Sequence, residues 1–262
     1  MTRITETFSA LRQSGKKGFI PFITAGDPNL VTTGKLMVEL AHSGASIIEL
    51  GVPFSDPMAD GPVIQRASER ALRQGFGLKE IFSMTAEVRA IIDTPIVLFS
   101  YFNPLLQYGT KKLVNEARQA GIDAILVTDL IPEESKEFAD ELRNNSLDMI
   151  FLVAPTSTDD RLRLVAECAS GFIYAVSRAG VTGTQESLNQ AAERLVTRMR
   201  EFSELPVAVG FGISTANQVK EVWRFADAAV VGSAIVAEIE REGRSPHLVK
   251  NIGRFARSLT MD

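Results

Sequence analysis

Glu49 stands in an otherwise apolar segment, where a carboxylate could move protons. The segment from Ser46 to Gly51 is rich in β-branched and apolar residues, which is typical of a buried strand. Side chains alternate along a strand, so Glu49 should share a face with Ile47 and Gly51. Apolar surroundings disfavour the charged form, so we expect the pKa of Glu49 to be raised toward neutral pH. Glu49 is therefore a candidate acid–base catalyst; the alternative is a surface glutamate or a structural ion-pair partner.

The loop after this segment brings two further carboxylates close to the end of the predicted strand. It runs from Val52 to Pro62, and it contains several prolines together with Asp56 and Asp60. Proline restricts the backbone, so the loop should present its carboxylates in defined positions. Either aspartate could act on a substrate beside Glu49, or could simply form a turn or cap a helix. The spacing alone does not separate these two interpretations.

Glycine-rich turns follow the last predicted strands. They occupy residues 178–183, 210–214 and 232–234. Glycine lacks the Cβ that would hold an anion away from the backbone, so the N–H groups of a turn or of a helix's first turn can reach phosphate oxygens. One such turn would be explained by tight chain reversal alone. Three in successive units favour a phosphate-binding site.

Residues needed for several other chemistries are missing from the predicted strand ends. No predicted strand has an interior lysine, which argues against a Schiff-base aldolase. The two histidines, His42 and His247, lie in predicted helices, so no metal triad is expected. Cys168 has no histidine nearby, and burial explains it best. What remains is proton transfer by carboxylates on a phosphorylated substrate, without a metal or a covalent intermediate.

These residues need a fold that gathers strand ends in one place. Eight apolar runs are predicted as strands, at residues 18–24, 46–51, 95–100, 124–128, 149–153, 172–176, 206–210 and 228–232. Segments of helical period lie between them, at residues 30–42, 111–120, 133–144, 159–168 and 188–202, with Thr158 and Ser214 marking helix starts. Alternating strands and helices imply parallel pairing, and eight units favour an α/β fold of the (β/α)8 TIM-barrel type over an open doubly wound sheet.

A barrel of this type places chemistry on the loops that follow its strands. Polar residues gather at these positions: Asp27, Glu49, Asp56, Asp60, Asn103, Asp129, Ser177 and Arg178. The predicted fold and the predicted chemistry therefore point to the same end of the barrel.

Bulk properties exclude several classes of protein. The chain has 262 residues and a net charge of −4, with no basic run suited to nucleic acid. A single cysteine and the absence of a long apolar stretch indicate a cytoplasmic protein without disulfides or membrane spans. Residues 1–13 are predicted as an extra amphipathic N-terminal helix rather than a signal peptide. Without a linker, residues 1–262 are expected to form one domain.

The segment from Glu49 to Gln65 closely resembles the signature of the tryptophan synthase alpha chain family. The similarity extends to Phe19–Pro28, Ser177–Gly183 and Val209–Ser214, so it spans almost the whole chain. One departure is Ile131, where the family often has a proline. Membership implies a carbon–carbon lyase that cleaves indole-3-glycerol phosphate by a retro-aldol reaction, giving indole and glyceraldehyde 3-phosphate.

The resemblance also implies roles for individual residues. Glu49 would be the proton shuttle, Asp60 would hold the indole N–H, and Tyr174 would position the substrate and Glu49. The remaining substrate-binding residues would line an apolar pocket for the indole ring or hold the phosphate: Phe22, Phe99, Leu126 and Phe211 for the ring, and Thr182, Gly183, Gly212, Gly232 and Ser233 at the phosphate end.

A partner is implied as well. The family works with a beta chain as an alpha2-beta2 tetramer, and that chain carries pyridoxal phosphate and condenses indole with serine. Pro53, Asp56 and Asn103 would face this partner, whereas the alpha chain itself would need no cofactor or metal.

Other interpretations remain open at this point. Indole-glycerol-phosphate synthase would need a strand lysine, phosphoribosylanthranilate isomerase a suitably placed cysteine, and a sugar-phosphate epimerase a metal set. A stand-alone indole-releasing lyase would share the same active site. A non-catalytic phosphate-binding barrel would not need both Glu49 and Asp60.

Overall fold

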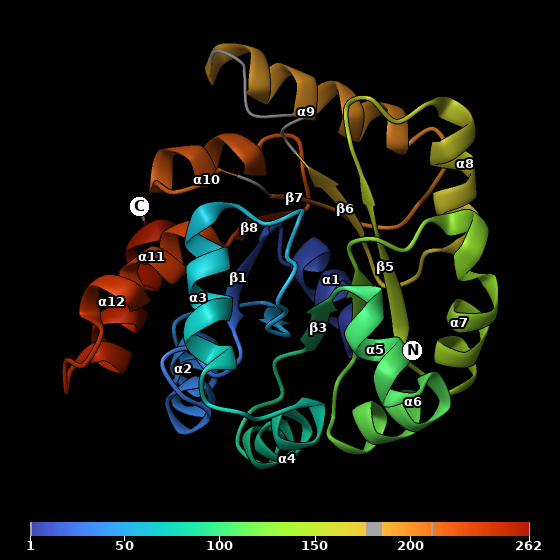
Figure 1. Cartoon of the computed structure of the whole chain (residues 1–262). Coiled ribbons are helices and arrows are strands. Elements are labelled where there is room, and N and C mark those ends of the chain that lie inside the picture. Colours follow the sequence, from blue (N-terminus) through green and yellow to red (C-terminus); the bar gives the residue numbers. More distant parts are fainter. Residues whose placement is uncertain (1, 177–184, 211, 262) are drawn as a thin grey trace.

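Eight parallel strands occupy the centre of the molecule and close into a barrel in sequence order, with β1 paired to both β2 and β8 (Figure 1). The computed structural model describes residues 2–176, 185–210 and 212–261, with the backbone alone for 185–189. The strands are β1 (Gly18–Thr24), β2 (Ile48–Gly51), β3 (Ile96–Ser100), β4 (Ala124–Val127), β5 (Asp148–Val153), β6 (Ile173–Val176), β7 (Val207–Gly210) and β8 (Ala228–Val231). The predicted eight-fold β/α barrel is confirmed, and the open doubly wound sheet is excluded.

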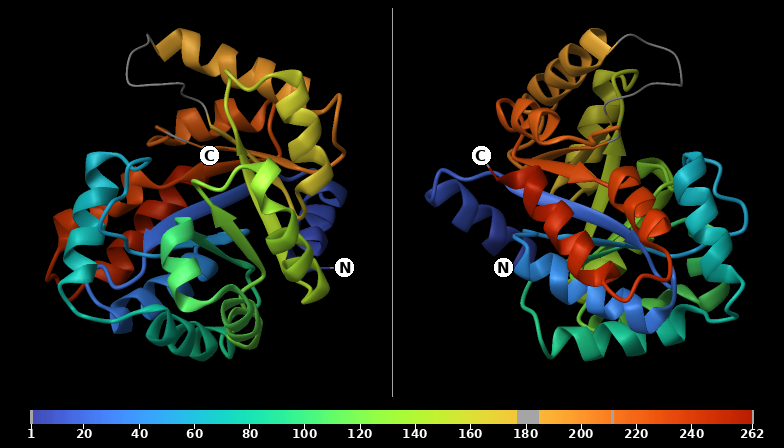
Figure 2. Two further views of the ribbon diagram at one scale, coloured as in Figure 1. Left: turned by 45° about the vertical axis from the view of Figure 1, so that its right-hand side comes forward. Right: turned by 90° about the vertical axis from the view of Figure 1, so that its left-hand side faces the viewer.

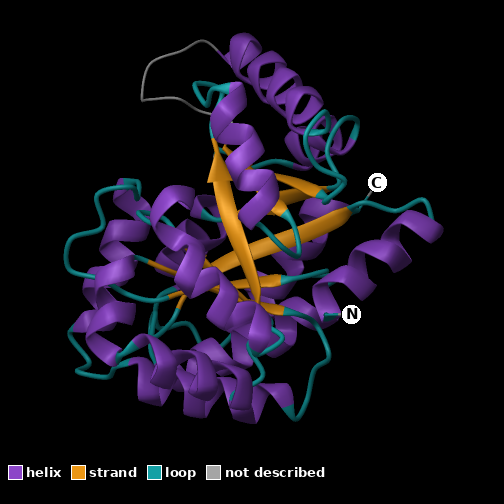
Figure 3. Cartoon of the chain, turned by 90° about the vertical axis from the view of Figure 1, so that its right-hand side faces the viewer, coloured by secondary structure: helices purple, strands orange, loops and turns teal. Residues whose placement is uncertain are grey.

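Helices surround the barrel and cover the outer faces of its strands (Figure 3). They are α1 (Arg3–Gln13), α2 (Leu30–His42), α3 (Pro62–Leu72), α4 (Leu78–Arg89), α5 (Phe102–Tyr108), α6 (Thr110–Gln119), α7 (Pro132–Asn144), α8 (Asp159–Cys168), α9 (Gln185–Met199), α10 (Ala216–Trp223), α11 (Ser233–Glu242) and α12 (Leu248–Thr260). None of the helices in the described part of the chain has both the length and the apolar character needed to cross a membrane.

The strands divide the apolar side chains into two cores. In β1, Ile20 and Phe22 belong to the cluster inside the barrel, whereas Phe19 and Ile23 belong to the cluster between the strands and the helices. Every residue of β1 is buried, which explains why barrel strands appear in the sequence as almost continuous apolar runs. A polar residue on an inner face, such as Glu49, therefore has unusual surroundings.

Helix α1 closes the end of the barrel at which the strands begin (Figure 2). Its buried residues Ile4 and Phe8 join the inner core, and the ring of Phe8 lies 5.7 Å from that of Phe172. The hydroxyl of Thr2 donates to Asp148 at 2.6 Å, beside the start of β5. With this end filled, the strand C-termini form the open end of the barrel.

Several predicted boundaries differ from the observed ones by one to three residues. Helix α10 follows Thr215 rather than Ser214, because the Thr215 hydroxyl accepts from the amide of Gln218 and caps the helix. His247 lies in the turn before α12 rather than within a helix. Thr158 caps α8 as predicted, and the N-terminal helix begins at Arg3, after its cap Thr2.

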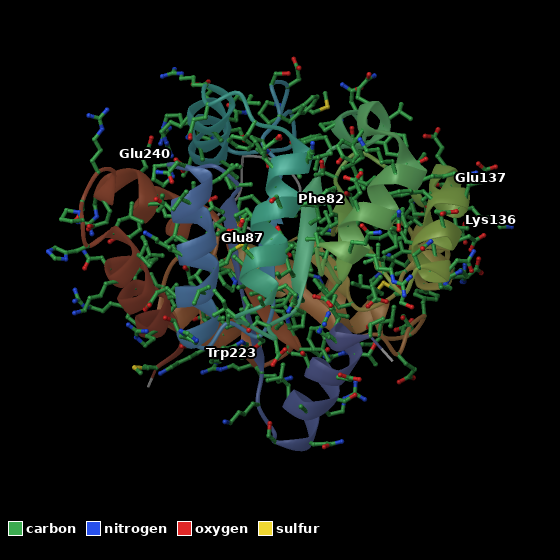
Figure 4. The ribbon with its side chains drawn as sticks, turned by 90° about the horizontal axis from the view of Figure 1, so that it is seen from below. Phe82, Glu87, Lys136, Glu137, Trp223 and Glu240 are labelled. Carbon is green, nitrogen blue, oxygen red and sulfur yellow. The ribbon has the colours of Figure 1, made fainter. Side chains whose placement is uncertain are left out.

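Ion pairs join the loop after β1 to α3 and α11. Arg70 on α3 binds the buried Asp27 through two hydrogen bonds of 2.8 Å and also donates to Glu240 at 2.7 Å. Arg66 binds the same glutamate, which is labelled on α11 in Figure 4. Asp27 is only 2% exposed, so its charge depends on Arg70 for a partner.

Removing Arg70 should destabilise the fold more than removing Arg66. Arg70→Ala leaves the Asp27 carboxylate buried without its partner, and we expect a loss of about 3 kcal/mol in the free energy of unfolding. Arg66→Ala breaks only a solvent-exposed pair and should cost much less stability than Arg70→Ala. Urea unfolding of both variants measures the difference. Equal losses would show that the contact with Asp27 adds no more to the free energy of unfolding than the surface pair does.

Candidate active site

The open end of the barrel is lined by large side chains from the inner face of the strands. Phe22, Phe99, Leu126 and Tyr174 all belong to the buried cluster inside the barrel. The rings of Phe22 and Phe99 meet edge to face with their centroids 5.3 Å apart. These four positions, predicted to bind substrate, therefore share the inner core of the barrel.

Glu49 lies among these residues on β2, in register with Phe22 on β1 and Val97 on β3. It is 1% exposed, and its Oε1 has no hydrogen-bond partner among the residues that the structure describes. Burial raises its pKa from 4.5 to about 8, so the carboxyl is largely protonated at neutral pH. The raised pKa predicted from the sequence is confirmed, and the interpretation of Glu49 as a surface glutamate is wrong.

Tyr174 approaches Glu49 from β6. Burial and the negative charge of Glu49 both raise the pKa of this phenol well above its usual value, so Tyr174 stays protonated. A Cβ at Gly210 would lie only 2.0 Å from the Tyr174 hydroxyl, so a glycine is needed there. Gly51 makes room in the same way for the ring of Phe22, whose nearest atom would be 2.5 Å from a Cβ.

The sequence interpretation missed the spatial role of these two glycines. Gly51 and Gly210 stand at the last positions of β2 and β7, and each gives space to an aromatic side chain on a neighbouring strand. A sequence signal for this role does exist. It is a glycine at the last position of a strand, next to a strand that carries an inward-facing aromatic residue. The sequence predicts Gly51 on the same strand face as Glu49 and Gly210 in a glycine-rich turn, but not this spatial role.

Asp60 projects from the loop between β2 and α3. Burial raises its pKa from 3.8 to about 6, and a hydrogen bond from the hydroxyl of Tyr101 acts in the opposite direction. Helix α3 has Gly61 as its N-cap and receives no side-chain cap, so Asp60 is not a capping residue. Its backbone is held by hydrogen bonds to Pro57 and from Gln65. Glu49 and Asp60 are thus two perturbed carboxyls with different pKa values.

Tyr101 is a functional candidate that the sequence interpretation did not identify. It follows β3 directly, is 3% exposed, and accepts a hydrogen bond of 2.9 Å from the amide of Ala59. The only available signal was its position after a strand, two residues before the named Asn103. Which loop a side chain contacts is not visible in a single sequence.

The predicted phosphate residues are described in part. Thr182, Gly183 and Phe211 lie outside the described residues, as do Ser177 and Arg178. Gly212 has φ of 80°, a conformation that favours glycine. Gly232 and Ser233 form the start of α11, which has no side-chain cap, so its first amides have no partner within the helix. The amides of Ser214 and Thr215, by contrast, both donate to Gln218.

The residues predicted to face a partner differ in exposure. Asp56 and Asn103 are exposed, and Asp56 accepts from the neighbouring hydroxyl of Ser55. Pro53 is buried in the isolated chain and so does not itself present an open surface. It borders a hollow of about 300 Å³ that is also lined by Pro104 and Tyr108. The two predicted partner segments therefore meet at this hollow, with Pro53 as part of its wall.

A larger hollow lies elsewhere on the molecule. It measures about 590 Å³ and runs between α2 and α4 on the outside of the barrel, beside Val31, Glu87 and Ile91 (Figure 4). None of the candidate catalytic residues lines it. The volume of a hollow is therefore a poor guide to the active site of this protein. The carboxyls with raised pKa values, Glu49 and Asp60, are a better one.

The described residues contain no group of three or more histidine, cysteine, aspartate or glutamate side chains that could hold a metal ion. His42 ends α2 on the barrel exterior, and Cys168 is a free, partly buried thiol at the end of α8. The groups assembled at the open end are carboxyls, a phenol and apolar side chains. The barrel and its two perturbed carboxyls are typical of an enzyme that works by acid–base catalysis.

Comparison with known proteins gives the family. The profile of the tryptophan synthase alpha chain matches residues 8–258. A tryptophan synthase alpha chain from Citrifermentans bemidjiense is 47% identical over 259 residues, covering 99% of this chain and 97% of the relative. The chain belongs to the tryptophan synthase alpha chain family. Its predicted membership, and the lyase class that membership implies, are confirmed.

Solved structures agree with this placement. Tryptophan synthase subunit alpha from Legionella pneumophila superposes with a TM-score of 0.92 at 35% identity, covering 99% of this chain and 97% of that one. A chain of the tryptophan synthase complex from Pyrococcus furiosus gives a TM-score of 0.83 at 36% identity, covering 92% and 97%. The fold is therefore shared over nearly the full length.

The pKa of Glu49 makes a prediction about stability. Between pH 4.5 and about 8 the folded chain holds a proton on Glu49 that the unfolded chain has lost. Raising the pH through this window should therefore lower the free energy of unfolding, by at most about 1.4 kcal/mol per pH unit from this group. Glu49→Gln should lack this contribution.

Urea unfolding across the window measures the slope. Glu87→Gln, which changes an exposed carboxyl on α4, serves as the control and should keep the wild-type slope. If Glu49→Gln and wild type show the same pH dependence, the carboxyl of Glu49 is not buried as described.

Proposed function

We propose that Glu49 and Asp60 divide the proton transfers by which this chain cleaves indole-3-glycerol phosphate into indole and glyceraldehyde 3-phosphate. The observation that carries the proposal is the buried Glu49 carboxyl inside the barrel, which has a pKa of about 8 and an Oε1 without a hydrogen-bond partner in the described part of the chain. The reaction needs one group to give a proton to the indole ring and to take one from a side-chain hydroxyl. Glu49 is suited to do both in turn.

The proton balance supports this assignment. Protonated Glu49 donates to the ring carbon that carries the side chain, and its carboxylate then removes the hydroxyl proton as the carbon–carbon bond breaks. The bonding electrons return to the ring, the hydroxyl carbon becomes an aldehyde, and Glu49 regains its starting state. No net proton is consumed, so neither a metal nor a redox cofactor is required on this chain.

Asp60 has the complementary protonation state. With a pKa of about 6 it is mostly ionised at neutral pH, so it can accept the indole N–H and stabilise the positive charge that ring protonation creates. Two carboxyls whose surroundings separate their pKa values are a recurring basis for assigning acid and base roles. Burial acts more strongly on Glu49 than on Asp60, and this difference sets the two roles.

The surrounding residues suit the rest of the substrate. Phe22, Phe99 and Leu126 would enclose the indole ring, and Tyr174 would orient the substrate and Glu49. The amides at Gly212 and at the start of α11, Gly232 and Ser233, would hold the phosphate. Thr182, Gly183 and Phe211 would complete this site from outside the described residues.

The solved relative from Pyrococcus furiosus is a tryptophan synthase complex, and we extend that assembly to this chain. A beta chain carrying pyridoxal phosphate would dock over Asp56, Asn103 and the hollow beside Pro53, in an alpha2-beta2 tetramer. We further propose that residues 1–262 act as one domain in the cytoplasm. Nucleic acid and membrane are not expected partners.

Neutralising the carboxyls should stop the reaction. Glu49→Gln keeps the shape but cannot cycle a proton, so kcat should fall by at least about 100-fold while a phosphorylated product analogue still binds. Asp60→Asn should have a smaller effect, because it removes charge stabilisation alone. Release of indole and glyceraldehyde 3-phosphate, with and without a beta chain, gives the rates; Glu87→Gln, which changes an exposed carboxyl on α4, is the control that should retain turnover. Near-normal turnover by Glu49→Gln would refute its role.

The phosphate end can be tested separately. Ser233→Val places a branched side chain at the first turn of α11 and should raise the Kd for glycerol 3-phosphate roughly tenfold. Ser214→Val is the matched control, because the Ser214 amide is already taken by Gln218. Calorimetric titration of both variants measures the effect, and an unchanged Kd in Ser233→Val would remove α11 from the phosphate site.

A further inference from the structure

Tyr101 connects the end of β3 to the loop that carries Asp60. Its side chain is buried, and its hydroxyl oxygen accepts the amide hydrogen of Ala59 at 2.9 Å. The same hydroxyl faces the side chain of Asp60, the next residue along the loop, and as a hydrogen-bond donor it lowers the pKa of that carboxyl. One phenol thus holds the loop backbone at Ala59 and acts on the carboxyl of Asp60.

The direction of these hydrogen bonds is set by elementary chemistry. A backbone amide can only donate, so the Tyr101 oxygen must accept from Ala59 and its own proton is left for Asp60. An ionised carboxylate can only accept, so the Tyr101 proton and the Asp60 charge match. The arrangement favours the ionised form of Asp60 over the neutral one.

We propose that Tyr101 is the positioning residue for Asp60: its hydroxyl, oriented by the amide of Ala59, holds the Asp60 carboxylate in the ionised form and in place for the indole N–H. The proposal rests on the role given to Asp60 above. Tyr101 is not assigned a contact with the reacting atoms; it acts through Asp60.

Neighbouring contacts keep the Tyr101 ring in position. The ring of Phe54, from the same loop, lies 5.2 Å from it. Tyr101 immediately precedes α5, and the amide of Phe102 donates to Asp129 at 2.7 Å. The amide of Val52 donates to Phe99 at 2.8 Å, which ties the two strand ends together just below. The Tyr101 ring is therefore packed against Phe54, and the backbone on both sides of Tyr101 is tied to the neighbouring strand and loop.

Charged groups near the phenol keep it a donor. Among the described residues these are Asp60, on the loop after β2, and Asp129, after β4; together with burial they raise the pKa of Tyr101 far above neutral pH. Asp60 itself has burial acting to raise its pKa and Tyr101 acting to lower it, with a result of about 6. Without the hydroxyl, burial would be left unopposed and Asp60 would be neutral over more of the working pH range.

The test is Tyr101→Phe, which keeps the ring against Phe54 and removes only the hydroxyl. In the proposed mechanism kcat falls on the acid side as Asp60 is protonated and on the basic side as Glu49 ionises. Tyr101→Phe should move the acid limb upward by about one pH unit, so that turnover at pH 6 drops several-fold. The basic limb and KM should change little, which a general disruption of the site would not allow.

Thr85→Val is the matched control. Thr85 is buried on α4, and its hydroxyl donates to the carbonyl of Ile81 at 2.8 Å. This variant loses a buried hydroxyl away from Asp60, and it should keep both limbs. An unchanged acid limb in Tyr101→Phe, or an equal shift in Thr85→Val, would overturn the proposal.

A direct titration separates this proposal from the role of Asp60. The 13C signal of the Asp60 carboxyl, identified by its loss in Asp60→Asn, should titrate at higher pH in Tyr101→Phe, whether or not the chain turns over. If Asp60→Asn retains full activity, the catalytic role of Asp60 fails and the proposed positioning role fails with it, while the titration still tests the hydrogen bond. If only Asp60→Asn loses activity and the titration of Tyr101→Phe is unshifted, the proposal about Tyr101 alone fails.

A second variant covers a loss of folding in Tyr101→Phe. Tyr101→3,5-difluorotyrosine keeps the ring and the hydroxyl but makes the hydroxyl a stronger donor. The Asp60 carboxyl should then titrate at lower pH than in the wild type. A shift in the opposite direction, or none, would count against the proposal.

Discussion

A carboxyl group that is nearly sealed from water governs the chemistry of this barrel. Glu49 is 1% exposed, and no described residue forms a hydrogen bond with its Oε1. The proton therefore stays on the group at neutral pH, because the charged form is poorly solvated. If Glu49 were exposed to water or lay beside a cation, its carboxyl would be ionised at neutral pH. The barrel supplies apolar neighbours on both adjoining strands, and the free energy spent on burying the carboxyl makes it a proton donor.

The rest of the open end is arranged around that group. Gly51 and Gly210 remove side chains where Phe22 and Tyr174 need space, and these rings complete the apolar wall. Asp60 comes from a loop rather than a strand and is less deeply buried, so its pKa rises less. Two groups of the same chemical type thereby hold different protonation states at one pH, which a reaction that both gives and takes a proton requires.

Much of this could be predicted from the sequence, because the relevant signals are local. Barrel strands are buried on both faces, so eight apolar runs located them to within one or two residues, and alternation along β2 was enough to predict the burial of Glu49. Contacts between loops were not predictable in this way. The bond between Tyr101 and the 59–60 segment, the burial of Pro53 and the capture of the Ser214 amide by Gln218 all depend on how separate loops meet. Spacing along one chain contains no information about that.

The position of helix α1 determines how the reaction products can leave the barrel. Ile4 and Phe8 fill the end of the barrel at which the strands begin. A ligand inside the barrel therefore enters and leaves at the end where the strands finish. A cleavage reaction makes two molecules from one, and in a barrel of this shape the apolar fragment lies deeper than the anionic one when the phosphate is gripped at the rim. The fold then constrains the order in which the products leave. The deeper, apolar product has to pass the phosphate-binding site or move toward a docked beta chain. Because α1 fills one end of the barrel, both products have to leave through the end at which the strands finish, on the side where the beta chain is proposed to dock.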